Sequence, residues 1–253
     1  DGRYKKNVSE LETFFSEQAL MRHRVMVEVE YLLALVEHKS FQKTRTLSKK
    51  AFNSLKGLYV EFSSTHFKEI KKIEKKTNHD VNAVVVFVSE KLKKIGRDDL
   101  VPFVHFGLTS EDINNISYSL MTRGAVDSVM IPSVKGVLKE LKTLSKKTKS
   151  LSLLSLTHGQ PATTTTLGKE LAVFVSRVER EIALIKKMKL LAKLSGATGS
   201  YAAHKVAFPD LNWPLFSKRF VKKLGLEQSP ISTQIEPGDS LAELLHSFVR
   251  INN

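Results

Sequence analysis

The sequence predicts an all-α fold. Apolar residues recur at spacings of three and four along most of the 253-residue chain, the period of helices that bury one face. No segment shows the alternation of a half-buried strand, and we find no internal repeat. We expect an N-terminal helical domain over residues 1–100 and the first part of a central helical-bundle domain over residues 101–253, with a hinge across residues 97–104.

The composition is ordinary for a globular chain. Hydrophobic residues make up 42% and charged residues 26%, which is enough apolar surface to build a core. The sequence has no apolar run of membrane-spanning length and opens without a secretory signal. It has no cysteine, which excludes disulfides, zinc–thiolate sites and cysteine nucleophiles and favours a cytoplasmic location.

The net charge of +14 raises the question of nucleic acid as a partner. The lysines form pairs, such as Lys71–Lys72 and Lys186–Lys187, that alternate with apolar residues at helical spacing. The sequence shows no basic stripe interleaved with aromatic residues and no nucleic-acid motif. We therefore favour a lysine-rich solvated surface, which also suits a polyanionic small substrate.

The first hundred residues contain four helical patterns. Ser9 and Glu12 have capping-box spacing ahead of a helix that buries one face over residues 25–36. The next two patterns cover residues 47–62 and 67–73.

Asp80 is the expected N-cap of the fourth helix, whose apolar residues run over positions 81–92. The run at 84–88 has strand propensity, but its flanks keep the helical period and no hairpin partner follows. Gly96 is expected to end this helix.

The second part of the chain begins with a strong helix start. Thr109 and Asp112 have cap-box-like spacing, and the long helix that follows is expected to bend near Pro132. Another helix covers residues 171–185. The glycine loop at 196–200 fits neither the dinucleotide nor the phosphate-loop spacing, so we interpret it as a turn that lets backbones approach closely.

The last fifty residues continue the helical pattern. Pro214 opens a short helix that closes at Gly225, and a polar loop covers residues 232–237. Asp239 caps a final pattern that is still running at Asn253. We therefore expect the chain to be cut inside a helix and to lack its natural start.

The stretch Thr157–Thr166 lies between two helical patterns and is polar, almost free of charge and rich in hydroxyls. It holds one imidazole, that of His158. Such side chains are suited to holding a polar ligand against helix ends. The alternative is a capped interhelical turn with a structural histidine.

Polar side chains also gather at other helix termini. Free N–H groups and the helix dipole at these ends attract phosphates and carboxylates, and two of the junctions carry an imidazole, which exchanges protons near neutral pH. No histidine spacing fits a metal site. Together the junctions suggest a polyanion site in an all-α enzyme. They are Arg3–Tyr4, Asn78–His79–Asp80, Thr109–Ser110, Thr157–His158 and Gln234.

At these residues the sequence resembles the fumarase/aspartase superfamily and, within it, the bacterial type of the adenylosuccinate lyase family. Argininosuccinate lyases, which usually differ around the TSED position, rank second. The matching stretches occur in order along nearly the whole chain. They are DGRY from Asp1, KKTNHDVNAV from Lys75, HFGLTSEDINN from His105, LTHGQPATTTTLGKE from Leu156 and TQIEP from Thr233.

The resemblance implies a β-elimination without a cofactor. Fumarate would leave adenylosuccinate to give AMP, and would leave a succinylaminoimidazole carboxamide ribonucleotide likewise, both in purine biosynthesis. Such chemistry needs a pocket that stabilises a carboxylate, a positioned base and a positioned acid. The resemblance makes His158 the acid that protonates the leaving nitrogen and His79 an assisting catalytic residue.

The resemblance also implies substrate-binding roles. Arg3 and Tyr4 would hold the phosphate, and Thr109 and Ser110 a carboxylate of the succinyl arm. Arg24 is a further candidate anion contact. The residues that flank His79 or hold the substrate in register would be Asn78, Asp80, Thr157 and Gln234.

One departure from the family pattern matters. The family's catalytic base is a serine on a mobile downstream loop, which this chain lacks, so we expect no turnover from the chain alone. The resemblance implies a cytoplasmic homotetramer with shared active sites, a nucleotide substrate, and neither nucleic acid nor membrane as a partner. The alternative is a non-catalytic all-α protein of the same fold that binds nucleic acid or another partner.

Overall fold

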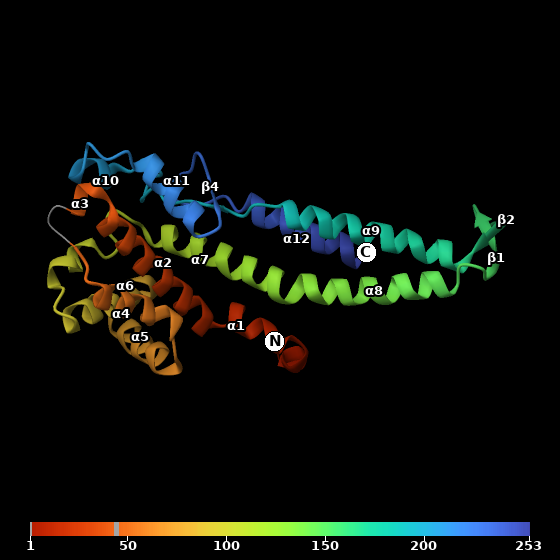
Figure 1. The fold of residues 1–253 in the computed structure, drawn as a ribbon, viewed down its shortest axis with the longest axis horizontal. Coiled ribbons are helices and arrows are strands. Elements are labelled where there is room, and N and C mark those ends of the chain that lie inside the picture. Colours follow the sequence, from red (N-terminus) through yellow and green to blue (C-terminus); the bar gives the residue numbers. More distant parts are fainter. Residues whose placement is uncertain (1, 43–45) are drawn as a thin grey trace. The chain divides into compact units, whose positions relative to one another are not determined.

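The computed structural model describes residues 2–42 and 46–253 (Figure 1), so Asp1 of the DGRY stretch lies outside the described residues. Its contacts divide into a first unit, Asp1–Gly124 with Leu190–Gly238, and a second, Ala125–Lys189 with Asp239–Asn253. This division by contacts differs from the expected boundary at residues 100 and 101, which stays a prediction. The all-α fold class is confirmed, with two short two-stranded sheets added to the helices.

The first unit is built around α2 (Glu17–Glu37), which packs against α4, α5 and α6. The expectation that this helix buries one face is wrong. It is buried on more than one face: the polar residues Arg24 and Glu28 are buried as well as the apolar ones, and Tyr31 packs edge-on against Phe216 and Phe220. The other helices of the unit are η1 (Gly2–Leu11), α1 (Glu12–Phe15), α3 (Lys39–Gln42), α4 (Lys49–Val60), α5 (Ser64–Thr77), α6 (Asp80–Lys94), η2 (Asp98–Phe103), α7 (Ser110–Ala125), α10 (Ala202–Ala207) and α11 (Trp213–Lys223).

The core of this unit is aliphatic and aromatic. Leu32 of α2 and Val84 and Phe87 of α6 are fully buried in one cluster, and each such side chain contributes roughly 1.5–3 kcal/mol by leaving water. The run at 84–88 is helical, as the period predicts. Burial on this scale fixes the start of α6, where the predicted site residues His79 and Asp80 lie.

Two predicted caps are displaced. Ser9 lies inside the 3-10 helix η1, and its hydroxyl donates to the Lys6 carbonyl, so it caps no α-helix. Ser16 is the N-cap of α2 and accepts a hydrogen bond from the Ala19 N–H. The N-cap of α6 is His79, with Asp80 as the first helical residue.

The glycine loop brings backbones together, as predicted. A Cβ on Gly199 would lie 2.0 Å from the Ser232 carbonyl oxygen, and a Cβ on Gly196 would lie 3.0 Å from that of Gly107. Strand β3 (Leu191–Ala192), which precedes this loop in the sequence, pairs in parallel with β4 (Glu227–Gln228). Only glycine permits such approaches at positive φ.

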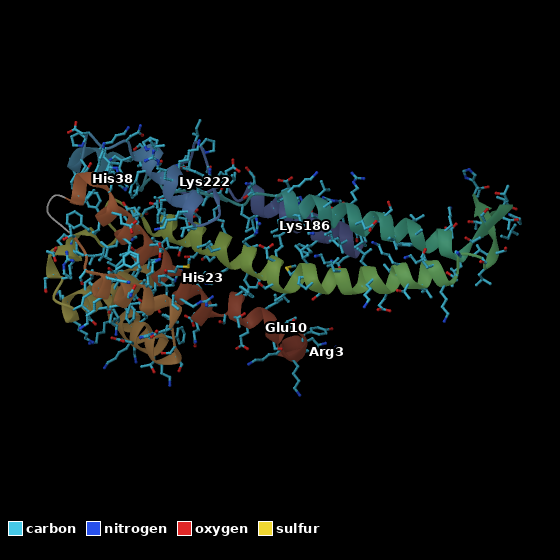
Figure 2. The ribbon with its side chains drawn as sticks, viewed as in Figure 1. Arg3, Glu10, His23, His38, Lys186 and Lys222 are labelled. Atoms are coloured by element: carbon cyan, nitrogen blue, oxygen red, sulfur yellow. The ribbon has the colours of Figure 1, made fainter. Side chains whose placement is uncertain are left out.

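The second unit contains α8 (Ile131–Lys147), α9 (Leu167–Lys187) and α12 (Asp239–Asn252), and α9 packs along both other helices (Figure 1). A π-helical turn, η3 (Val126–Met130), comes just before Pro132. It marks the place where the bend was expected, because proline cannot donate to the preceding turn. Lys186 lies in the last turn of α9, at the negative end of the helix dipole (Figure 2).

A β-hairpin joins α8 to α9, so the expectation of no strands is wrong here. Strand β1 (Ser152–Thr157) pairs antiparallel with β2 (Gln160–Thr166). The two turn residues, His158 and Gly159, have φ of 52° and 74°, the left-handed conformations of a tight hairpin turn. The β-branched threonines of β2 favour a strand over a helical turn.

Candidate substrate-binding site

The junction between α5 and α6 presents the first predicted catalytic residue. Asn78 ends α5 in a left-handed conformation, and His79 then turns the chain into α6. The His79 Nδ1 accepts the Asn82 N–H at 3.2 Å, which leaves the proton of a neutral ring on Nε2. About half of the side chain is exposed. The N-cap bond therefore orients the ring while its Nε2 edge stays free to meet a ligand.

Asp80 is held by an arginine from the core. The Arg24 Nη2 lies 2.7 Å from Asp80 Oδ2, and its Nε donates to Asn114 Oδ1 at 2.8 Å. Burial alone would raise the pKa of the Asp80 carboxyl, but the Val81 N–H and the Arg24 guanidinium outweigh it and lower that pKa. Arg24 is thus bound by protein groups and connects the α6 junction to α7.

The start of α7 contains Thr109 and Ser110, both half-buried. The Thr109 N–H donates to Asp112 Oδ2 at 2.9 Å, which is the capping contact that the spacing predicts. Asp112 itself is fully buried and forms an ion pair with Lys193 at 2.9 Å. The free N–H groups of the first turn of α7 remain suited to an anion.

Gln234 is connected to the same ion pair. Gln234 is exposed in the polar loop, and its backbone carbonyl accepts a hydrogen bond from the Lys193 ammonium at 2.8 Å. The first unit therefore joins Thr109 and Gln234 through Asp112 and Lys193. It also joins the α6 junction to α7 through Arg24.

Arg3 and Tyr4 lie on η1, which Figure 2 marks at Arg3. The Arg3 guanidinium stands 5.7 Å from the centre of the Tyr4 ring, and both side chains are exposed. Within the described residues, the structure shows no hydrogen bond or ion pair between these two side chains and the other predicted site residues. The two residues of the predicted anion clamp, Arg3 and Tyr4, are therefore neighbours on one exposed helical turn.

Thr157 and His158 belong to the second unit, where they lie at the tip of the β1–β2 hairpin. Both are exposed. His79 belongs to the first unit. The two imidazoles therefore lie in different units, and neither unit contains both of them.

The sequence gives no sign that His105 has a charged partner. The His105 Nδ1 lies 2.6 Å from an oxygen of Glu28, which is fully buried. Burial lowers the pKa of His105, but the bond to Glu28 outweighs it and the net pKa is raised. Lys193 was also missed, although a lone lysine inside the apolar run Leu190–Leu194 is a pattern typical of a buried, paired charge.

The described residues contain neither a candidate metal-binding cluster nor a candidate membrane-spanning helix. Within 2–42 and 46–253, no group of three or more His, Asp or Glu side chains is arranged to hold a metal ion. No helix in these ranges has both the length and the apolar composition needed to cross a membrane.

Solved structures share this helical fold. A fumarate lyase from Mesorhizobium sp. BNC1 matches with a TM-score of 0.75 and 19% identity, over 96% of this chain and 54% of that one. A β-carboxy-cis,cis-muconate cycloisomerase from Acinetobacter calcoaceticus sp. ADP1 matches with a TM-score of 0.73 and 22% identity, over the same shares of the two chains. At these identities the likeness concerns the fold.

Curated relatives are closer in sequence. The chain is 42% identical over 253 residues to an adenylosuccinate lyase of Escherichia coli K12, and 42% identical over 259 residues to one of Dictyostelium discoideum. Both matches cover the whole of this chain and 56% of the relative, so the chain spans about half the length of these relatives. The profile of the family described as "Lyase" matches residues 2–253, and the chain belongs to that family.

Proposed function

We propose that the protein is a lyase that eliminates fumarate from adenylosuccinate to give AMP, and from succinylaminoimidazole carboxamide ribonucleotide in the same way. The observation that carries this proposal is the bridge from Asp80 through Arg24 to Asn114. It connects the His79 junction to the helix that begins at Ser110, so an imidazole and an anion-binding helix start share one scaffold. The identity to relatives named adenylosuccinate lyase supports the substrate.

The proposed reaction uses the residues of this chain for binding and acid catalysis. A base outside the chain removes the proton beside the substrate carboxylate, and that electron pair forms the C=C bond of fumarate as the C–N bond breaks. The departing nitrogen keeps the bonding pair and takes a proton from His158. His79 assists near a carboxylate or phosphate of the substrate.

The negative charge that develops on the carboxylate needs oriented donors. The Ser110 N–H and the hydroxyls of Thr109 and Ser110, at the positive end of α7, are suited to that task. Arg3 and Tyr4 would bind the phosphate, and Thr157 and Gln234 would hold the substrate in register. Asn78 and Asp80 would flank His79 at the substrate. No cofactor enters this scheme.

The assembly follows from the same proposal. We expect a cytoplasmic homotetramer in which the exposed hairpin tip that carries His158 meets the His79 junction of another copy. Each site in this arrangement would draw on residues from more than one copy.

The test uses the complete gene product and this chain side by side. Each is incubated with adenylosuccinate, and fumarate and AMP are quantified by chromatography, with argininosuccinate as the comparison substrate. The expected result is equimolar fumarate and AMP from the complete product, and no turnover from the chain alone. No fumarate from adenylosuccinate, together with DNA binding that weakens steeply with salt, would instead favour the nucleic-acid alternative.

A further inference from the structure

Lys193 and Asp112 form the most deeply buried ion pair among the described residues of the first unit, with both side chains fully buried. The proposed reaction gives neither group a chemical role. Burying two charges is costly unless every donor and acceptor is satisfied, and an apolar pair of similar volume is often as stable. The pair is therefore distinguished by the geometry that it fixes rather than by the stability that it adds.

The ammonium of Lys193 has a partner for each of its three hydrogens. Besides Asp112, it donates to the Gly196 carbonyl at 2.6 Å and to the Gln234 carbonyl at 2.8 Å. One side chain thus fixes the polar loop at residues 232–237 to the glycine loop.

The carboxylate of Asp112 is equally saturated. It accepts the N–H groups of Thr109, Ser195 and Gly196 at distances between 2.9 and 3.1 Å. The lysine is itself fixed, because its backbone exchanges two hydrogen bonds with the Asn115 side chain, at 2.8 and 3.0 Å.

We propose that Lys193 is a positioning residue for the substrate site, and this inference rests on the proposed function. Three segments distant in the sequence meet at its ammonium and at the partner carboxylate. Two of them carry predicted substrate-binding residues, Thr109 with Ser110, and Gln234. Lys193 sets the spacing between these two segments before the substrate arrives, and it touches no substrate atom.

The test compares Lys193→Met with the unmodified complete gene product. Loss of the ammonium frees the Gln234 carbonyl, so amide hydrogen exchange in residues 232–237 should become about tenfold faster. Because the substrate-binding groups are then misplaced, KM should rise by about tenfold, while kcat stays within about twofold, because the acid and base are untouched. Asp112→Asn with Lys193→Met removes both charges and supplies a second variant if the single one does not fold.

Two control variants separate positioning from stability. Leu55→Ala opens the α4 core and lowers the melting temperature without touching either loop, and Lys71→Met removes an exposed, ion-paired lysine. Neither should change KM or the exchange of residues 232–237.

Unchanged exchange in the loop, or unchanged KM despite faster exchange, would overturn the role of Lys193. An equal rise of KM in Leu55→Ala would do the same, since it would show a general effect of instability. An inactive unmodified protein would overturn the proposed function, which distinguishes that failure from failure of the positioning role.

Discussion

Arg24 of α2 and Asp80 of α6 form an ion pair of 2.7 Å in which the arginine is almost fully buried and the carboxylate is partly open to solvent. Breaking this pair would cost free energy at a second contact as well, because the Arg24 Nε also donates to Asn114. The residue next to His79 is therefore tied to the interior, while His79 itself faces outward. This relationship links the stability of the core to the geometry of the proposed site.

Replacing the buried arginine should affect both stability and activity. Arg24→Met leaves Asp80 and Asn114 without their charged donor, and we expect a loss of about 1–3 kcal/mol in the free energy of unfolding. We also expect kcat/KM of the complete product to fall by about tenfold or more, since the His79 junction loses its anchor. Lys169→Met, which removes an ion pair between the exposed side chains of Lys169 and Glu170, is the control and should change neither quantity appreciably. Wild-type kinetics in Arg24→Met would contradict the proposed scaffold.

The proposed acid is tested by two substitutions at one position. His158→Ala should lower kcat of the complete product by about a hundredfold or more, because the leaving nitrogen loses its proton donor. His158→Asn should lose as much activity while preserving the hairpin, since asparagine tolerates the left-handed backbone found there. Steady-state kinetics and circular dichroism check the two outcomes. Full activity in the asparagine variant would assign His158 a turn-forming role only.

Close packing of α8 against α9 depends on one glycine. A Cβ on Gly168 would lie 2.4 Å from the Ser145 carbonyl oxygen, so Gly168→Ala should cost about 1–3 kcal/mol by forcing the helices apart. Gly136 is the matched control, because a Cβ at this position of α8 meets nothing within 4 Å. Gly136→Ala should stabilise by about 0.5–1 kcal/mol through its higher helix propensity. Urea unfolding of both variants measures the difference, and equal effects would argue against the contact.

Acid should destabilise the first unit through His204. Burial lowers the pKa of His204 to about 4 from its ordinary 6.5. The folded state binds this proton less readily than the unfolded state does. The contribution of neutral His204 to the free energy of unfolding is therefore fully present above pH 6.5 and is lost as the pH falls toward 4. At about 1.4 kcal/mol per pKa unit, the loss over this window is roughly 3 kcal/mol. In His204→Gln, the unfolding free energy should depend less on pH between these values, and an unchanged slope would contradict the assignment.

Helical periodicity was sufficient to predict α4, α5, α6 and α9, because each shows apolar residues on a regular stripe. The β1–β2 hairpin was not predicted, because a two-residue turn at His158–Gly159 depends on backbone conformation more than on hydrophobic pattern. The threonine run of β2 was the available indication of a strand.

The sequence predicted which helix ends contribute to the candidate site, but it did not predict the contacts between them. The junction residues could be found from capping patterns and from the family resemblance. The roles of Arg24 and Lys193 could not, because each depends on partners tens of residues away: Asp80 and Asn114 for Arg24, and Asp112 and Gln234 for Lys193. A sequence pattern shows that such a charge is buried, but tertiary packing decides which partner neutralises it.

The aromatic cluster around His204 also gives the protein an internal optical probe. The chain has a single tryptophan, Trp213, and its ring centre lies 4.5 Å from that of His204. A protonated imidazole at this distance quenches indole emission, so the fluorescence of the unlabelled protein should report the charge of one histidine. Rapid acidification in a stopped-flow instrument would then time the opening of this cluster without any dye or engineered label.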